Sequence, residues 1–222
     1  MRYAGISLGL ALLLGLPAAP ADAGETGWRL RGFGALLNPD TSETTVNDDG
    51  DDILIEADRG FGGGGGVEYQ FHRFVGIDVG VMGASPEITL SADIAELGAL
   101  SLADNLSTGV FTGDVLVHLT PGSPIVDLYA GAGIAAVTTG GLTFDVLGIQ
   151  RLNVDGENYV TWSARAGLDL AFGRDSRWAA SLGVRYIPGD IELRQLGVPA
   201  EEATAEIGFN ILSFTAGVAY RF

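Results

Sequence analysis

The feature that most constrains this chain is a two-residue alternation of apolar and polar side chains in eight separate segments. In the last segment every second residue from Leu212 to Phe222 is apolar, and the residues between include Ser213, Thr215 and Arg221. Successive side chains of a strand point to opposite faces, so the alternation predicts strands with one apolar and one polar face. The eight segments are approximately 27–37, 60–71, 74–83, 109–120, 125–137, 159–172, 177–187 and 209–222.

The connections between these segments alternate in length. Three are short, at His72-Arg73, 121–124 and 173–176. Four are long, at about 38–58, 84–108, 138–158 and 188–208. Short periplasmic turns alternating with longer outer loops are typical of bacterial membrane barrels. We therefore predict an all-β, eight-stranded antiparallel up-and-down transmembrane β-barrel in the outer membrane, with periplasmic termini and extracellular long loops; a soluble β-sandwich is the alternative.

Aromatic side chains on the apolar face favour the membrane barrel. They form two groups, as expected for interface girdles on either side of an apolar band. Trp162 and Phe172 are ten residues apart, which corresponds to about 25 Å of height for a strand tilted by about 40°. The group near the short turns is Trp28, Tyr69, Phe71, Phe172, Trp178, Tyr220 and Phe222, and the group near the long loops is Phe111, Trp162, Tyr186 and Phe214.

The first 23 residues have the pattern of a secretory signal peptide. Arg2 precedes an apolar run over 6–16, and an A-x-A cleavage site follows at Ala21–Ala23. A membrane anchor is the alternative, but the run is too short to span a bilayer. We expect residues 1–23 to be a signal peptide for export in a Gram-negative bacterium and residues 24–222 to form the barrel domain.

The net charge of -16 is concentrated in the predicted loops. The four long connections hold 20 of the 28 acidic residues and two of the 12 arginines. Acidity of this kind argues against a nucleic-acid partner, which needs a basic surface. The chain has no Cys and two His, so we expect neither disulfides nor a metal centre, and no cofactor.

Three local features could indicate other functions: a glycine-rich motif, an acidic segment and a histidine. Each of them is better explained by the predicted barrel. Gly60–Gly65 matches G-x-G-x-x-G, but the preceding strand and following helix of a dinucleotide site are missing. The acidic segment 48–52 resembles a calcium loop whose first ligand position is Thr45, so we expect a solvated loop, with weak divalent-cation binding as the alternative. His118 lies near the predicted periplasmic end, away from the outer headgroups, so a Ser-His lipid deacylase is disfavoured and we expect no enzyme.

The predicted lumen face is charged near the short turns and in mid-barrel. An eight-stranded barrel is just wide enough for side chains to fill, so buried charges there must pair. Arg29, Glu68 and Asp127 share this face with the residues of a predicted salt-bridge plug. The plug residues are Arg31, Arg165, Arg185, Arg221, Asp78, Asp114 and Asp169. An ion-selective lining is the alternative interpretation of these residues.

Toward the long loops the same face becomes apolar. The residues are Leu37, Met82, Val110, Val137, Ile187 and Ile211. They are interpreted either as core filling or as a small apolar ligand pocket open to the outside, with the charged plug as its floor.

Several motifs, in order, resemble the OmpW family of small outer-membrane proteins along nearly all of the predicted mature chain. They are Trp28–Gly32 with Leu37–Pro39, Leu128–Gly133, Ala166–Asp169, Val184–Ile187 and Gly217–Phe222. The resemblance implies an eight-stranded barrel that passes small hydrophobic molecules, which leave sideways into the bilayer. The family's Pro-Pro pair before the fourth strand is missing at Leu106–Gly109, so a gate at that position is not carried over.

These observations predict a passive conduit for small hydrophobic molecules. The expected partners are outer-membrane lipid and lipopolysaccharide, a small apolar ligand, and the barrel-assembly machinery through the C-terminal Phe222. The alternative is a non-transporting surface barrel whose acidic outer loops bind a partner or divalent cations.

Overall fold

The computed structural model describes residues 27–40, 42–46, 52–94, 98–121, 123–146, 150–156, 158–172, 177–195 and 204–222. The predicted signal peptide, the short turn at 173–176 and residues 48–51 of the acidic segment lie outside them. Among the described residues no helix is long and apolar enough to cross a membrane.

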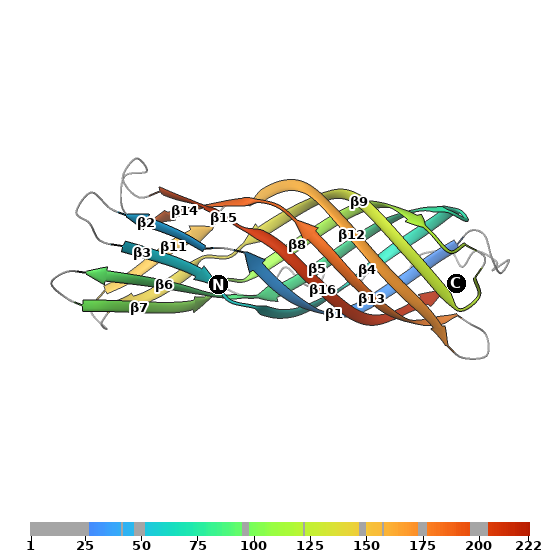
Figure 1. Ribbon diagram of the computed structural model, residues 1–222, viewed down its shortest axis with the longest axis horizontal. Coiled ribbons are helices and arrows are strands. Elements are labelled where there is room, and N and C mark those ends of the chain that lie inside the picture. Colours follow the sequence, from blue (N-terminus) through green and yellow to red (C-terminus); the bar gives the residue numbers. More distant parts are fainter. Residues whose placement is uncertain are drawn as a thin grey trace.

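Eight antiparallel strands close into a barrel, in the order β1-β16-β13-β12-β9-β8-β5-β4 (Figure 1). The prediction of an eight-stranded up-and-down barrel is confirmed. Each strand pairs with the strands that precede and follow it in the barrel, and β1 pairs with β16 to close it. The barrel strands are β1 (Gly27–Asp40), β4 (Gly60–His72), β5 (Val75–Ser85), β8 (Thr108–His118), β9 (Val126–Thr139), β12 (Tyr159–Phe172), β13 (Trp178–Ile187) and β16 (Asn210–Arg221).

The four long connections, predicted as outer loops, form β-hairpins. Two hairpins pair into a sheet of order β2-β3-β6-β7, and the other two form a sheet of order β10-β11-β14-β15. Extended hairpins satisfy backbone hydrogen bonds that irregular loops would leave to water. The hairpin strands are β2 (Ser42–Val46), β3 (Asp52–Ala57), β6 (Glu87–Ile94), β7 (Gly98–Asn105), β10 (Leu142–Val146), β11 (Gln150–Gly156), β14 (Asp190–Gln195) and β15 (Thr204–Gly208).

The hairpin sheets extend from one end of the barrel, and the C-terminus lies at the other end (Figure 1). At that other end the described residues include the turn between β4 and β5 and most of the turn between β8 and β9. The first turn is Arg73-Phe74, one residue later than predicted, because a register shift lets His72 pair with Val75. In the turn before β9, Thr120 Oγ1 donates to the Val126 carbonyl at 2.9 Å and accepts from the Leu128 amide at 2.8 Å. Side-chain bonds of this kind replace backbone pairing in a short loop.

Side chains alternate between the lumen and the outer face on every barrel strand. On β5, for example, Asp78 and Met82 are buried whereas Val79 and Val81 are exposed. Because an eight-stranded barrel has no room for water-filled space, the inward side chains are the core of the molecule. The outward face carries large apolar residues, as a lipid-facing surface requires.

Candidate functional site: a two-layered lumen

The half of the lumen toward the tight turns holds five arginines and five carboxylates. All seven predicted plug residues point inward, together with Arg29, Glu68 and Asp127. Their partners come from strands far apart in the sequence, since Arg29 on β1 donates to Asp169 on β12 across 140 residues. Register and closure of the barrel therefore decide which charges meet.

The part of this network nearest the tight turns centres on Arg29 and Arg31. Arg29 Nη2 lies 2.7 Å from Asp127 Oδ2, and its Nη1 lies 2.9 Å from Asp169 Oδ2. Arg31 Nη2 lies 2.7 Å from Glu68 Oε2 and 3.1 Å from the same Asp169 oxygen. Each guanidinium thus bridges two carboxylates, and these side chains are all at most 9% exposed.

The part nearer mid-barrel pairs Arg165 and Arg185 with Asp78 and Asp114. Arg165 Nη1 lies 2.6 Å from Asp78 Oδ1, and Arg185 Nη2 lies 2.6 Å from Asp114 Oδ2. Arg31 also reaches Asp78 at 3.0 Å, so it joins the two parts into one network. Buried charges are tolerated only when paired and hydrogen-bonded in this way. The pairing joins the charged side chains of this layer into one connected network of ion pairs.

His118 belongs to this network, although strand alternation predicts only that it lies on the lumen face. Its Nε2 lies 2.8 Å from Glu68 Oε1, and its Nδ1 lies 3.0 Å from Asp127 Oδ1. The side chain is 1% exposed. His118 is four residues from Asp114 on β8, so the alternation places both side chains on the lumen face. The two partners of His118 lie on β4 and β9, and the strand register decides that they meet it.

Tyr129 is a second member that sequence reasoning missed. Two guanidinium groups lie over its ring, with Arg31 Cζ at 4.8 Å and Arg165 Cζ at 5.2 Å from the ring centroid. The neighbouring strand makes room for it through Gly167, where an added Cβ would collide with the Tyr129 ring. Cations over an aromatic face are stabilised, most strongly where water is excluded. The ring therefore holds the two parts of the network together.

The half of the lumen toward the hairpins is apolar. The six residues predicted to line a pocket are each at most 7% exposed and belong to one cluster. Ala35, Ile88, Leu106 and Phe209 complete its packing. The structure thus shows a closed apolar layer in place of an open pocket, because side chains from the bases of the hairpins cover it. A cavity of about 40 Å³, bordered by Met82 and Val110 on one side and Arg31 and Arg165 on the other, lies between the two layers.

One seam of the barrel is incompletely paired beside this apolar layer. The recorded register between β12 and β13 ends at Ala164–Tyr186, although β12 begins at Tyr159. Pairing between the two chain segments resumes in the hairpin sheet at Gly156–Leu193. Tyr159 spans the interval, because its hydroxyl donates to the Phe209 carbonyl at 3.3 Å and an added Cβ at Gly189 would collide with its ring. This side chain therefore bridges the interval between the two paired stretches.

The aromatic residues lie on the outer face in two bands. Near the tight turns Trp28 packs on Tyr69 with ring centroids 4.7 Å apart, and Trp178 packs on Tyr220 at 4.8 Å. Near the hairpins Trp162 packs on Tyr186 at 5.7 Å. Most of these rings are 38–55% exposed in the isolated chain, which is the arrangement of side chains that anchor a barrel at two lipid–water interfaces.

Two other sequence patterns have structural explanations. Gly60–Gly65 is the first part of strand β4 and pairs with both β1 and β5, so it opens no helix. Within the described residues no group of three or more His, Cys, Asp or Glu is arranged to hold a metal ion. Residues 48–51 of the acidic segment that resembles a calcium loop lie outside that part of the chain.

Comparisons with known proteins agree with this architecture. The family model described as outer membrane protein β-barrel domain matches residues 8–222. The outer membrane protein OprG from Pseudomonas aeruginosa is similar in structure, with 15% identity, a TM-score of 0.66, and coverage of 90% of this chain and 96% of that one. The outer membrane protein AlkL, solved in lipid bilayers, is similar with 17% identity, a TM-score of 0.60, and coverage of 94% and 95%.

No curated protein sequence matches significantly. The expected resemblance to small outer-membrane barrels is confirmed in family and in fold, and the expected location in the outer membrane is confirmed with it. The chain belongs to the family of outer membrane proteins with a β-barrel domain.

Proposed function

We propose that this protein is a passive conduit for small hydrophobic molecules across the outer leaflet of the outer membrane. The observation that carries the proposal is the division of the lumen into an apolar layer and a fully ion-paired layer. An apolar solute gains about 25 cal/mol for each Å² of surface that leaves water, so it enters the apolar layer when the covering side chains at the bases of the hairpins move aside. The same solute cannot displace the paired charges, because breaking a buried pair costs several kcal/mol.

A solute that enters the apolar layer therefore leaves sideways. The seam between β12 and β13 is the weakest wall of this layer, because Tyr159 closes it with one side-chain hydrogen bond. Displacing one such bond costs about 1 kcal/mol, much less than separating several backbone pairs. Lateral movement through this seam needs no cofactor and breaks no covalent bond, so the function that we propose is not enzymatic.

The proposal includes an orientation. The hairpin sheets face the outside and the tight turns face the periplasm, as in bacterial barrels with short periplasmic turns. The C-terminus lies at the tight-turn end, which supports this assignment (Figure 1). A cysteine at Asn105, an exposed residue at the end of β7, should react with an impermeant maleimide in intact cells, whereas one at Arg73 should not.

The experiment that tests the conduit compares an inward with an outward substitution on one strand. Val110 lies in the apolar layer at 1% exposure, and Val117 lies on the lipid face of the same strand at 44%. Val110→Thr places a hydroxyl in the solute's path, and we expect slower transfer of a hydrophobic fluorophore such as phenylnaphthylamine into vesicles that contain the barrel. Val117→Thr is the matched control and should transfer at the unmodified rate. If both variants fold and transfer the fluorophore at equal rates, the apolar layer is only part of the packed core and is not a path for solutes.

A non-transporting surface barrel that binds partners through its acidic hairpins remains the rival. Deleting residues 41–57 removes one outer hairpin and separates the two functions. A conduit should retain transfer of the fluorophore after the deletion, whereas a hairpin-dependent binder should retain none of its binding.

A further inference from the structure

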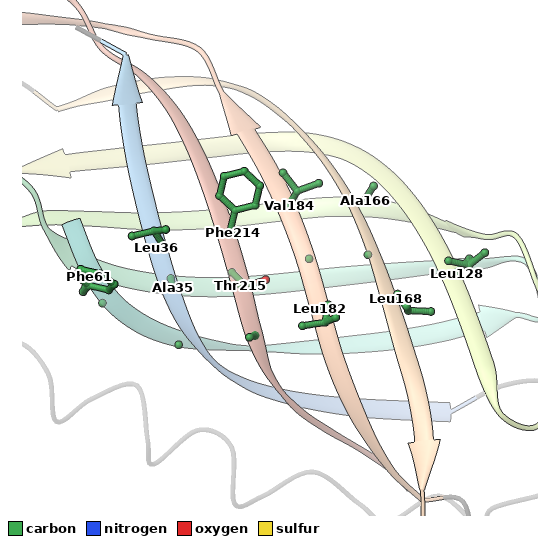
Figure 2. Close-up of a pocket in the computed structure, with 15 residues that line it drawn as sticks. Ala35, Leu36, Phe61, Leu128, Ala166, Leu168, Leu182, Val184, Phe214 and Thr215 are labelled. Carbon is green, nitrogen blue, oxygen red and sulfur yellow. The ribbon is translucent and has the colours of Figure 1, made fainter. Parts of the chain in front are cut away.

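The outer face of the barrel contains an apolar groove that the proposed conduit does not use. It has a volume of about 730 Å³ and crosses β1, β16, β13 and β12 (Figure 2). Large side chains form its borders, among them Phe61, Phe214 and Leu182, while Gly34 and Ala216 form a low floor between them.

Glycine at position 34 is not required by the barrel itself. The nearest atom to an added Cβ there is the Ala216 carbonyl oxygen at 3.9 Å, so a larger side chain has room. Glycine weakens a strand by roughly 0.5–1 kcal/mol relative to alanine. Glycine at position 34 therefore keeps the floor of the groove low at a cost in stability. The absence of a side chain there leaves space for a molecule outside the barrel.

The guanidinium of Arg59 lies at the hairpin end of this groove. Arg59 is exposed, and its Nε donates to Asn38 Oδ1 at 3.1 Å. Asn38 shares the outward face of β1 with Leu36, a groove residue two positions away, which is about 7 Å along a strand. Leu36 is paired with Phe61 on β4. The guanidinium is thus held just beyond the groove.

Arg59 also has unused hydrogen-bonding capacity. Within the described part of the chain its side chain makes one hydrogen bond, from Nε to Asn38 Oδ1. The two terminal nitrogens of the guanidinium are free to bind a phosphate, for which its planar fork is well suited. The apolar groove is suited to the acyl chain of a phosphorylated lipid, and the guanidinium of Arg59 beyond it is suited to the phosphate of the same lipid.

We propose that this face binds one lipid A molecule of the outer leaflet, with an acyl chain in the groove and a phosphate on Arg59. The site rests on the orientation proposed above, since the hairpin end must face the leaflet that contains lipopolysaccharide. It does not depend on transport, because the groove lies on the outside of the barrel and the conduit runs inside.

Native mass spectrometry of the purified full-length barrel with added lipid A tests the site. Arg59→Gln should weaken retention about fivefold, which corresponds to the roughly 1 kcal/mol that one basic residue contributes near an anionic membrane surface. Gly34→Leu should abolish specific retention by filling the groove. Lipid A without phosphates should bind the unmodified protein and Arg59→Gln equally.

Two matched controls keep the test specific. Arg73→Gln removes the same charge at the tight-turn end. Gly113→Leu adds the same side chain on β8, opposite β16 in the barrel order, at a position where an added Cβ meets nothing within 4 Å. Both controls should retain lipid A like the unmodified protein. Equal retention by all four variants would overturn the site, and equal binding of phosphatidylglycerol would overturn the choice of lipid A.

Discussion

Asp169 offers the sharpest test of whether paired charges hold the lumen together. It is fully buried, and its carboxylate binds Arg29 at 2.9 Å, Arg31 at 3.1 Å and the Ser181 hydroxyl at 2.7 Å. Asp169→Asn preserves the shape but removes the charge that two guanidinium groups share. Removing one partner of a buried ion pair costs about 3–5 kcal/mol, because the remaining charge stays in a low-dielectric interior. We expect a loss near the lower limit, about 3 kcal/mol, since both arginines keep another carboxylate.

Arg221→Gln is the matched comparison within the same network. Arg221 lies at the end of β16, its side chain is 30% exposed, and it contacts Asp127 at 3.2 Å. Water screens a pair at such a position, so its loss should cost less than about 1 kcal/mol. Asp127 also remains paired with Arg29 and His118. The structure thus predicts a difference of at least about 2 kcal/mol between two substitutions that each remove one charge.

Equilibrium unfolding in urea, with the barrel inserted in lipid vesicles, measures this difference. Tryptophans 28, 162 and 178 lie on the outer face, so their fluorescence reports the loss of lipid contact. A double variant, Asp169→Leu with Arg31→Met, removes one charge of each sign and should be less destabilised than the sum of its single variants by at least about 1 kcal/mol. If Asp169→Asn and Arg221→Gln lower the unfolding free energy equally, burial of the charges does not determine their importance and the reasoning fails.

Three further predictions concern other parts of the barrel. Gly167→Ala should destabilise the fold by about 1–3 kcal/mol, because its Cβ would collide with the Tyr129 ring; Gly113→Ala, whose Cβ meets open space, should raise the stability by up to about 1 kcal/mol in the same urea titration. Tyr159→Phe removes the bond to the Phe209 carbonyl, and it should speed transfer of the hydrophobic fluorophore into vesicles, whereas Tyr69→Phe on the outer face should not; an unchanged rate would exclude the β12–β13 seam as the route. Phe222→Ala should reduce the amount of barrel inserted in living cells while refolding of the purified chain into lipid vesicles proceeds normally, since the side chain is proposed to be read by the assembly machinery; parallel losses in both assays would assign it a role in stability alone.

The sequence alone determined the membrane barrel and much of its lumen. Alternation is a local property of a strand, so it identified the eight strands within a few residues and the inward position of charges such as Asp78 and Arg185. Some hairpin strands carry the same alternation, for example Glu87–Ile94 and Leu142–Val146, but these segments are shorter than the barrel strands. Alternation alone does not show which of them pair with each other, and only the structure joins them into two sheets. It likewise left open whether Leu37 and Ile211 line a pocket or fill a core, since that depends on what covers them.

Only the tertiary structure decided which inward residues meet. The contacts of Arg29 with Asp169 and of His118 with Glu68 join residues 140 and 50 positions apart. Such contacts follow from the stagger of strands that barrel closure imposes, and strand patterns carry no record of that stagger. The same stagger places Asn38 beside Arg59 and opens the seam that Tyr159 spans. Periodicity thus decides which way each side chain points, and closure of the sheet decides what it touches.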